Sequence, residues 1–344
     1  MRICVSDAGP LTPERDAGSR ATADAISSLR ELGHHVVFLP ISDVVDLGDF
    51  DLFLASRPGP AVHAIAAQGF RDIPTVFFGH DLHFQRMVVS VGSAKAEAFR
   101  RMEAMCWRAY DMSVYPSIEE AQYVNDFLGI DRAVAVPIYR MGDSNSGASS
   151  KSPTPTCVFV GSATHEPNQA AVEMLLADIW PAIRRETDAS LQLVGDWEVP
   201  ASHGVELGID VHSNLSDTQL NDLVTRSWLT LAPVPFGAGV KRKVIHALHC
   251  GTPVVGTRFA FQGVLDSNGG AVGGVLTDDS ASMAEVAIEL LGNPGARGEL
   301  AQTGQTWVGR HYSPEVVQRK WGEVIDYALA AFNDRTAGRT EGDA

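Results

Sequence analysis

Residues Gly237–Thr257 read GAGVKRKVIHALHCGTPVVGT, and this stretch predicts the local fold. Two glycines open it, apolar residues then recur at helical spacing, and Gly251 and Pro253 end that spacing before a short apolar run. We expect a tight turn, a helix with one face on a sheet, and a strand, which is the repeating unit of an α/β fold. The basic residues Lys241–Lys243 lie where the helix begins. Because the first N–H groups of a helix favour anions, the stretch predicts a phosphate site.

The charge of the whole chain makes this basic cluster stand out. The 344 residues carry 42 acidic and 27 basic side chains, which gives a formal net charge of -15. No Asp or Glu lies between Leu223 and Leu265, whereas the same stretch contains Arg226, Lys241, Arg242, Lys243 and Arg258. A local positive field in an acidic chain favours an anion site over a merely solvated helix face. The motif G-x-x-x-x-G-K-S/T is absent, which argues against a P-loop NTPase.

The composition of the chain limits the classes of protein to which it can belong. The chain is 45% hydrophobic and 20% charged, which is typical of a globular protein with ample material for a core. No apolar run approaches the roughly 18 residues of a membrane span, and the N-terminus MRICVSDAG lacks the layout of a signal peptide. The cysteines form no CxxC pair and are expected to be free thiols in a reducing cytosol: Cys4, Cys106, Cys157 and Cys250. The acidic balance argues against nucleic acid as a partner. We therefore expect a cytoplasmic protein, and a local basic patch could still bring it to the inner face of the membrane.

The rest of the chain repeats short apolar strands separated by amphipathic helices, which predicts parallel sheets covered on both faces. Residues 1–150 are expected to form one Rossmann-like domain, with a polar Ser-, Gly- and Pro-rich linker at about 141–156. Residues 151–312 are expected to form a second such domain. A Ser-Pro-Glu start predicts a last helix over 313–333 that packs back on the first domain, followed by a disordered tail over 334–344.

This pattern defines the predicted fold class, which is α/β with two doubly wound domains. Ligands of such sheets bind beyond the carboxyl ends of the strands, so two facing domains are expected to enclose a ligand cleft.

Several segments carry a resemblance to a known family. The C-terminal ones are VFVGSATHEPNQAAVEMLLADIWPAIRR, LQLVGD and APVPFGAGVKRKVIHALHCGTPVVGTRFAFQGV. In this order they resemble the C-terminal domain of GT-B glycosyltransferases of the retaining family 4 type, also called glycosyl transferases group 1. The N-terminal segments TPERDAGSRATADAISSLRELGHHVVFLP and TVFFGHDLHFQR resemble that family's first loop and helix and its HDLH loop. The resemblance covers about residues 1–330.

The resemblance implies a nucleotide-diphosphate sugar as donor, retention of anomeric configuration, and no metal or other cofactor. Lys241 and Lys243 would hold the diphosphate and stabilise the negative charge on the departing nucleotide. His80 would lie beside the reacting sugar; the alternative is a structural histidine at a strand end. The remaining residues implied to bind the donor are Gly18, Ser19, Arg20, Gly161, Gly195, Gly237, Gly239, His246 and Gln262. The glycines Gly161 and Gly195 would leave room for phosphate and nucleoside, whereas Gly18 is alternatively a simple turn residue.

The sequence departs from the family at three positions. His246 stands where the family usually has a glutamate that accepts hydrogen bonds from donor hydroxyls, and Ala238 and Gln262 stand where glutamates are frequent. A neutral imidazole or an amide accepts fewer hydrogen bonds than a carboxylate. The donor is therefore held differently, or bound more weakly, or activity has been lost. Because a charged imidazole cannot accept, one hypothesis is that His246 makes donor affinity depend on pH.

The leading functional hypothesis is a glycosyltransferase whose acceptor enters near Asp81–Arg86. The acceptor class stays open between a glycan, a lipid-linked molecule and a small molecule, as in polysaccharide or natural-product biosynthesis. The alternative is a catalytically degenerate GT-B protein that binds nucleotide or glycan, or that partners an active transferase. A nucleotide-sugar epimerase is disfavoured, because the sequence shows no additional acids that would serve its chemistry.

Overall fold

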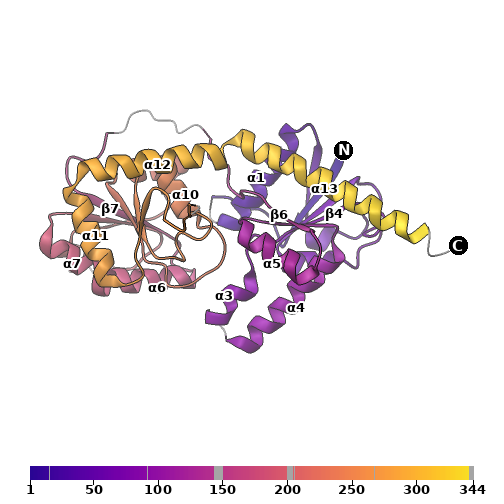
Figure 1. Cartoon of the computed structure of the whole chain (residues 1–344), viewed down its shortest axis with the longest axis horizontal. Coiled ribbons are helices and arrows are strands. Elements are labelled where there is room, and N and C mark those ends of the chain that lie inside the picture. Colours follow the sequence, from indigo (N-terminus) through magenta and orange to yellow (C-terminus); the bar gives the residue numbers. More distant parts are fainter. Residues whose placement is uncertain are drawn as a thin grey trace. The chain divides into compact units, whose positions relative to one another are not determined.

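The computed structural model describes residues 1–14, 16–90, 92–142, 150–199, 204, 206–266 and 268–340, without the side chains of 88–90 and 338–340. Most of the expected linker, residues 143–149, therefore lies outside the described residues. The chain divides into two compact units (Figure 1). The N-terminal unit comprises Met1–Arg140 and Tyr312–Ala344, and the C-terminal unit comprises Met141–His311.

The N-terminal unit is built on a six-stranded parallel sheet in the order β2-β1-β3-β4-β5-β6. Its strands are β1 (Arg2–Asp7), β2 (His35–Pro40), β3 (Leu52–Ser56), β4 (Thr75–Phe78), β5 (Met112–Tyr115) and β6 (Ala133–Ala135). Its helical segments are α1 (Ala17–Glu31), η1 (Ile41–Asp43), α2 (Pro58–Ala64), α3 (His83–Ser90), α4 (Ser93–Ala109), α5 (Ile118–Leu128) and α13 (Pro314–Thr340). The strand order reverses between β1 and β3, which is the position where doubly wound sheets open a ligand crevice.

Helix α1 begins where the sequence provides a cap. The side chain of Asp16 accepts hydrogen bonds from the backbone N–H groups of Gly18 and Ser19, which otherwise have no partner within the helix. Ala21, Ala25 and Leu29 recur at helical spacing and are buried. The cap and this apolar face fix the start of α1 at the carboxyl end of β1.

Helix α13 packs against α1 and against strands β4 and β5 (Figure 1). Its Trp321 is buried edge-on against Phe78, with the ring centres 5.2 Å apart. The sequence predicted disorder from residue 334, but the helix continues to Thr340. The prediction was wrong for these turns because Arg335 forms an ion pair at 2.7 Å with the buried carboxylate of Asp111. Residues 341–344 lie outside the described residues.

The C-terminal unit also has a six-stranded parallel sheet, in the order β12-β11-β10-β7-β8-β9. Its strands are β7 (Thr156–Val160), β8 (Ser190–Val194), β9 (Ile209–His212), β10 (Leu229–Ala232), β11 (Val254–Gly256) and β12 (Gly274–Leu276). Its helical segments are α6 (Glu166–Met174), η2 (Leu175–Ile179), α7 (Trp180–Glu186), α9 (Asp217–Arg226), α10 (Arg242–His249), α11 (Ser280–Gly292) and α12 (Pro294–Tyr312). Counted along the chain, this is the 3-2-1-4-5-6 order of the dinucleotide-binding fold, with the switch point between β7 and β10. The predicted α/β class with two doubly wound sheets is confirmed.

Two local features concern the cysteines and one helical stretch. All four cysteines are free, as expected, and all four are buried; burial raises the pKa of the Cys157 thiol to about 12. Between α6 and α7, the π-helical turn η2 lies just before Pro181. Proline cannot donate a backbone hydrogen bond and crowds the preceding turn, which accounts for the wider turn there. Within the described parts of the chain, no helix combines the length and apolar character that crossing a bilayer requires.

Candidate functional site

The first polar cluster lies at the switch point of the N-terminal sheet. Asp7 ends β1, Ser56 ends β3, and Thr22 faces them from α1. The Ser56 hydroxyl donates to the Asp7 carboxylate at 2.9 Å and lies 2.9 Å from the Thr22 hydroxyl. All three side chains are essentially inaccessible to solvent. A buried carboxylate surrounded by hydroxyls is thus fixed at the carboxyl edge of the sheet.

Arg57 follows directly and is held in a strained conformation. Its φ of 70° is unusual for a residue that is not glycine. The guanidinium lies 3.2 Å from the Asp7 carboxylate and 3.0 Å from the Asp16 carboxylate. Such strain costs about 1–3 kcal/mol and persists where surrounding contacts over-determine the backbone. The two ion pairs provide those contacts and aim the guanidinium at the start of α1.

His80 is the predicted catalytic histidine, and it joins the same cluster. It also has a positive φ, of 67°. Its Nε2 lies 2.8 Å from the Ser56 hydroxyl, and its ring packs at 4.2 Å on Phe78. Burial, with a further contribution from Arg57, lowers the pKa of His80 to about 3. The imidazole is therefore neutral at physiological pH.

The predicted residues at the start of α1 differ in what they contact. Gly18 does lie beside His80: a Cβ on Gly18 would be 3.4 Å from the His80 Nδ1 and 3.2 Å from the Arg57 guanidinium carbon. The Ser19 hydroxyl, however, donates to Asp16 at 2.8 Å. The Arg20 Nε donates to a backbone carbonyl of the preceding loop at 3.1 Å. Gly18 therefore brings no side chain against the imidazole and the guanidinium, whereas the Ser19 and Arg20 side chains support the loop.

The HDLH loop that follows β4 is anchored by buried carboxylates. Glu103 of α4 accepts hydrogen bonds from the backbone N–H groups of His83 and Phe84, at 3.1 and 3.0 Å. Burial raises the pKa of Glu103 to about 7. Although burial also raises the pKa of Asp81, its neighbours His83 and Arg86 lower it below its usual range. The segment proposed to meet the acceptor is thus fixed at its start, and α3 pairs with α4 beyond it (Figure 1).

The second polar cluster lies at the switch point of the C-terminal sheet. Lys243, in the first turn of α10, donates to the side-chain oxygen of Asn168 in α6 at 2.6 Å. Its ammonium also lies 4.3 Å from the centre of the Phe159 ring, a cation–π distance. Burial, and to a lesser degree the charge of Lys241, lowers the pKa of Lys243 to about 7. An amide oxygen and a ring face replace the carboxylate that usually accompanies a buried ammonium.

Lys241 shapes the turn before the helix. Its ammonium donates to the backbone carbonyls of Ala238 and Gly239 at 3.0 and 2.6 Å, and lies 3.5 Å from the side-chain oxygen of Gln262. Gly239 has a φ of 73°, and a Cβ on Gly237 would lie 3.3 Å from the Lys241 side chain. The structure therefore brings the predicted residues Gly237, Gly239 and Lys241 together in one turn, with the side chain of Gln262 beside it.

Gly161 and Gly195 are packed against their own unit. A Cβ on Gly195 would lie 2.1 Å from the carbonyl oxygen of Gly161, and one on Gly161 would lie 2.8 Å from the Asn168 amide. The indole N–H of Trp197 donates to the Gly161 carbonyl at 3.0 Å. Packing alone therefore requires glycine at both positions, and their expected role toward phosphate and nucleoside stays a prediction.

His246 is buried between α10 and α9. Its Nε2 lies 2.5 Å from the side-chain oxygen of Asn221. Burial and the nearby Arg242 lower the pKa of His246 to about 4. The imidazole is then neutral across the usual assay range, so the hypothesis that its charge makes donor affinity depend on pH is not supported.

Several site residues escaped the sequence analysis. Asp7, Ser56 and Arg57 contact His80 directly or through one another, and Asn168 holds Lys243. A usable signal existed, because the first three end or directly follow the apolar strand runs RICVSD and LFLAS. Polar residues at the carboxyl ends of parallel strands meet at the ligand-binding edge of a sheet.

The described residues contain no group of three or more His, Cys, Asp or Glu side chains arranged to hold a metal ion. The DxD-like pair Asp49 and Asp51 instead surrounds Arg2: Asp51 accepts from the Arg2 backbone N–H at 2.6 Å, and Asp49 lies 3.8 Å from its guanidinium.

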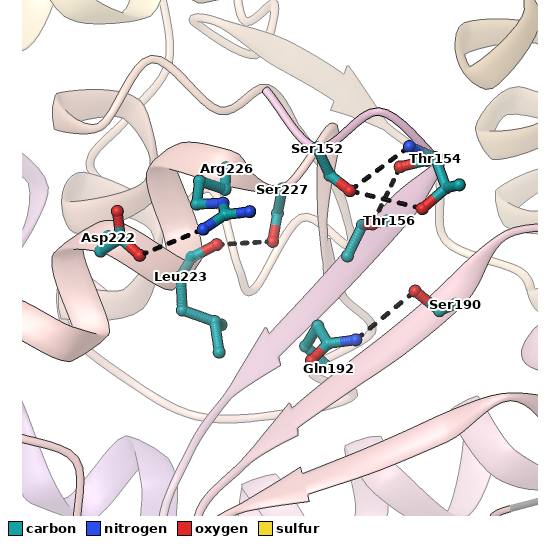
Figure 2. Close-up of a pocket in the computed structure, with 9 residues that line it drawn as sticks. All are labelled: Ser152, Thr154, Thr156, Ser190, Gln192, Asp222, Leu223, Arg226 and Ser227. Atoms are coloured by element: carbon teal, nitrogen blue, oxygen red, sulfur yellow. Dashed lines mark hydrogen bonds and ion pairs between the residues drawn. The ribbon is translucent and has the colours of Figure 1, made fainter. Parts of the chain in front are cut away.

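A cavity of about 270 Å³ lies elsewhere in the C-terminal unit (Figure 2). Thr156 and Ser190, the first residues of β7 and β8, contribute to its wall. The other lining residues are Ser152, Thr154, Gln192, Asp222, Leu223, Arg226 and Ser227. This cavity is therefore at the amino ends of the strands, at the opposite edge of the sheet from Lys243.

Comparison with solved structures defines the class of fold. HepE of Anabaena in complex with UDP aligns with a TM-score of 0.69 and 13% identity over 95% of this chain and 100% of that chain. Sucrose-phosphate synthase from Thermosynechococcus elongatus aligns with a TM-score of 0.73 and 14% identity over 96% and 99%. WaaG, a glycosyltransferase involved in lipopolysaccharide biosynthesis, aligns with a TM-score of 0.63 and 13% identity over 94% and 99%. The chain has the GT-B fold that these proteins share.

A match to a sequence family gives a narrower classification than the fold does. Residues 154–293 match the family described as glycosyl transferases group 1. The matched region contains Lys241, Lys243 and His246. No curated protein matches the chain. The resemblance of the C-terminal segments to glycosyl transferases group 1 is confirmed over residues 154–293, within the C-terminal unit.

Proposed function

We propose that the protein is a glycosyltransferase that moves a sugar from a nucleotide-diphosphate sugar to an acceptor, with retention of anomeric configuration and without a metal ion. The match to glycosyl transferases group 1 supports the reaction class. The likeness to HepE, which was solved with UDP and glucose and with UDP-glucose, supports a nucleotide-sugar donor. Four cysteines that all stay unpaired are typical of a reducing compartment, which supports a cytoplasmic site of action.

The observation that carries the proposal is the environment of Lys243. This partly buried ammonium lies at a topological switch point, beside the start of α10, and contacts an amide oxygen and an aromatic ring. Buried charges are normally paired with an opposite charge. A donor diphosphate on this turn would provide the missing negative charge. During transfer, Lys243 and Lys241 would then stabilise the charge that develops on the departing nucleoside diphosphate.

The departures at His246 and Ala238 change how strongly the donor is held. With Nε2–H donating to Asn221, the neutral His246 ring keeps one acceptor, at Nδ1. A donor hydroxyl could therefore still form one hydrogen bond where the family glutamate accepts several. We expect a lower affinity for the nucleotide than in relatives that have that glutamate, and not a loss of the site.

The cluster around His80 is proposed to act on the sugar. Its two positive-φ residues, Arg57 and His80, are typical of a functional site, and Gly18 brings no side chain against either of them. The acceptor, a glycan, a lipid-linked molecule or a small molecule, is proposed to meet this unit near the HDLH loop.

A thermal-shift screen of UDP, GDP, ADP and dTDP with their sugars tests the donor proposal. We expect one nucleotide to raise the melting temperature of the wild type and to lose this effect in the Lys241→Ala/Lys243→Ala double variant. Arg258→Ala is the matched control, because Arg258 is an exposed cation of the same acid-free stretch that pairs with Asp278. No stabilisation by any nucleotide would contradict the proposal.

A second assay separates an enzyme from a degenerate binder. The stabilising nucleotide sugar is incubated with and without EDTA, and release of nucleotide and the anomer of the product are followed by NMR. We expect slow hydrolysis that EDTA does not change, with retained configuration. Binding without any hydrolysis or transfer would favour the degenerate GT-B alternative, which the replacement of glutamate by His246 motivates.

A further inference from the structure

The Ser56 hydroxyl has one proton and two lone pairs, and three groups surround it. It lies 2.9 Å from the Asp7 carboxylate, 2.9 Å from the Thr22 hydroxyl and 2.8 Å from the His80 Nε2. Asp7 is the carboxylate partner of Arg57 and offers only acceptors. The single Ser56 proton must therefore point at Asp7, since two oxygens 2.9 Å apart without a proton between them would repel each other.

This assignment determines the protonation of the imidazole. With its proton on Asp7, the Ser56 oxygen can only accept from His80, so Nε2 must carry the ring proton. A neutral imidazole has one ring proton, and Nδ1 is therefore a bare acceptor. The pKa of His80, lowered to about 3 by burial and by Arg57, agrees with a single neutral state over the physiological range.

The bare nitrogen faces Gly18, which brings no side chain against it. A Cβ on Gly18 would lie 3.4 Å from Nδ1. Among the described residues of the N-terminal unit, the hydrogen bond of His80 is the one to Ser56, and it uses Nε2. The Arg57 guanidinium lies beside the same glycine, since one of its nitrogens would also lie 3.4 Å from that Cβ.

We propose that Ser56, oriented by Asp7, is a positioning residue that fixes His80 with Nδ1 as a hydrogen-bond acceptor, and that the substrate group which His80 recognises is therefore a hydroxyl donor. A group that can only accept, such as an ether or a fluorine at the same sugar position, would place two acceptors in contact and be rejected. What the Nδ1 recognises rests on the proposed function, whereas the tautomer itself does not.

The tautomer is measured first on the free protein. Two-dimensional NMR of the 15N-labelled chain distinguishes a protonated from a bare ring nitrogen, and a His80→Gln variant identifies the His80 signals among the 11 histidines. We expect Nε2 protonated and Nδ1 bare from about pH 5 to about pH 8. A wild type with the proton on Nδ1 would overturn the proposal outright, even if no Ser56 variant folds.

Variants then test the part played by Ser56. Ser56→Ala should allow a measurable share of the Nδ1-protonated form. Thr22→Val is the matched control, because Thr22 is equally buried and its hydroxyl bonds to Ser56 but not to the ring. We expect the control to keep the wild-type tautomer. An unchanged tautomer in Ser56→Ala, or the same change in both variants, would overturn the role of Ser56.

Kinetics connect the tautomer to the substrate. For the nucleotide sugar that the wild type hydrolyses or transfers, Ser56→Ala should lower kcat/KM about 3- to 10-fold, as expected for one hydrogen bond to a neutral group. Ser28→Ala, which removes a buried hydroxyl of α1 that bonds to a backbone carbonyl, should change it less than about twofold. A wild type without activity would contradict the proposed function, but the NMR result on the tautomer would still stand or fall by itself.

Discussion

Lys243 should make nucleotide-sugar affinity depend on pH. With its pKa lowered to about 7, this lysine is only partly charged in the free protein at neutral pH. A bound diphosphate favours the charged form and raises the pKa toward its ordinary value, so binding takes up a proton. The sign follows: affinity is highest below about pH 7 and falls as the pH rises above it.

The size of the change in nucleotide-sugar affinity follows from the same pKa of Lys243. About half of Lys243 is charged at pH 7, and about 1% at pH 9. If only the charged form holds the diphosphate, Kd rises about 50-fold between these two conditions, equivalent to about 2.3 kcal/mol. Because the side chain is partly buried rather than fully enclosed, solvent screening reduces this figure, and we expect about 5- to 50-fold.

Isothermal titration calorimetry from about pH 6 to about pH 9 measures the change. A nucleotide sugar is the better probe than the free diphosphate, whose terminal phosphate titrates near pH 6. Lys243→Arg is the control, because a guanidinium stays charged throughout and should give a flat profile. His246 does not confuse the result, since the pKa lowered to about 4 keeps it neutral. A wild-type Kd that changes less than about twofold, with no proton uptake, would refute the reasoning.

Three substitutions test other parts of the structure. Gly18→Ala would place a methyl group beside the imidazole of His80 and the guanidinium of Arg57, and we expect activity in kinetic assays to fall at least about tenfold. Thermal melting should show little loss of stability, because alanine suits a helix start. Gly195→Ala would place Cβ 2.1 Å from the carbonyl of Gly161 at a φ of 140°, and should cost about 3–5 kcal/mol in urea unfolding, whereas a near-neutral result would contradict the packing described. Arg335→Ala removes the partner of the buried Asp111 and should cost about 1–3 kcal/mol and speed amide exchange in the last turns of α13, with exposed Arg319→Ala as the control.

The architecture could be predicted from the sequence because the patterns that indicate its strands and helices are local. Apolar runs of strand length, glycine and proline stops and helical spacing each depend on neighbouring residues, and they predicted both parallel sheets. The length of the C-terminal helix was underestimated because its last turns do not depend on neighbouring residues alone. They depend on the contact between Arg335 and Asp111, two residues more than 200 positions apart in the chain.

The candidate site likewise contains some residues that local sequence patterns indicate and others that they do not. Lys241–Lys243 and His80 were found because a basic cluster and a motif mark them along the chain. The position of Arg57 after a strand run could have marked it, but its contacts, like those of Asn168, become visible only when segments distant in sequence are brought side by side. The glycines at 161 and 195 were recognised as necessary, but local pattern could not show that Asn168 and Trp197 pack closely beside them.

The contacts at the ends of β7 and β8 restrict which substitutions this sequence can accept. Gly195 has to stay small because of the Gly161 carbonyl, and Gly161 has to stay small because of Asn168. Asn168 in turn keeps an oxygen toward Lys243. Because the Gly161 carbonyl is backbone, no substitution at 161 makes room at Gly195, whereas a change at Gly161, Asn168 or Lys243 would survive only with a compensating change among these three. Across homologues we expect them to vary together, as one inherited unit, while the surface around them diverges.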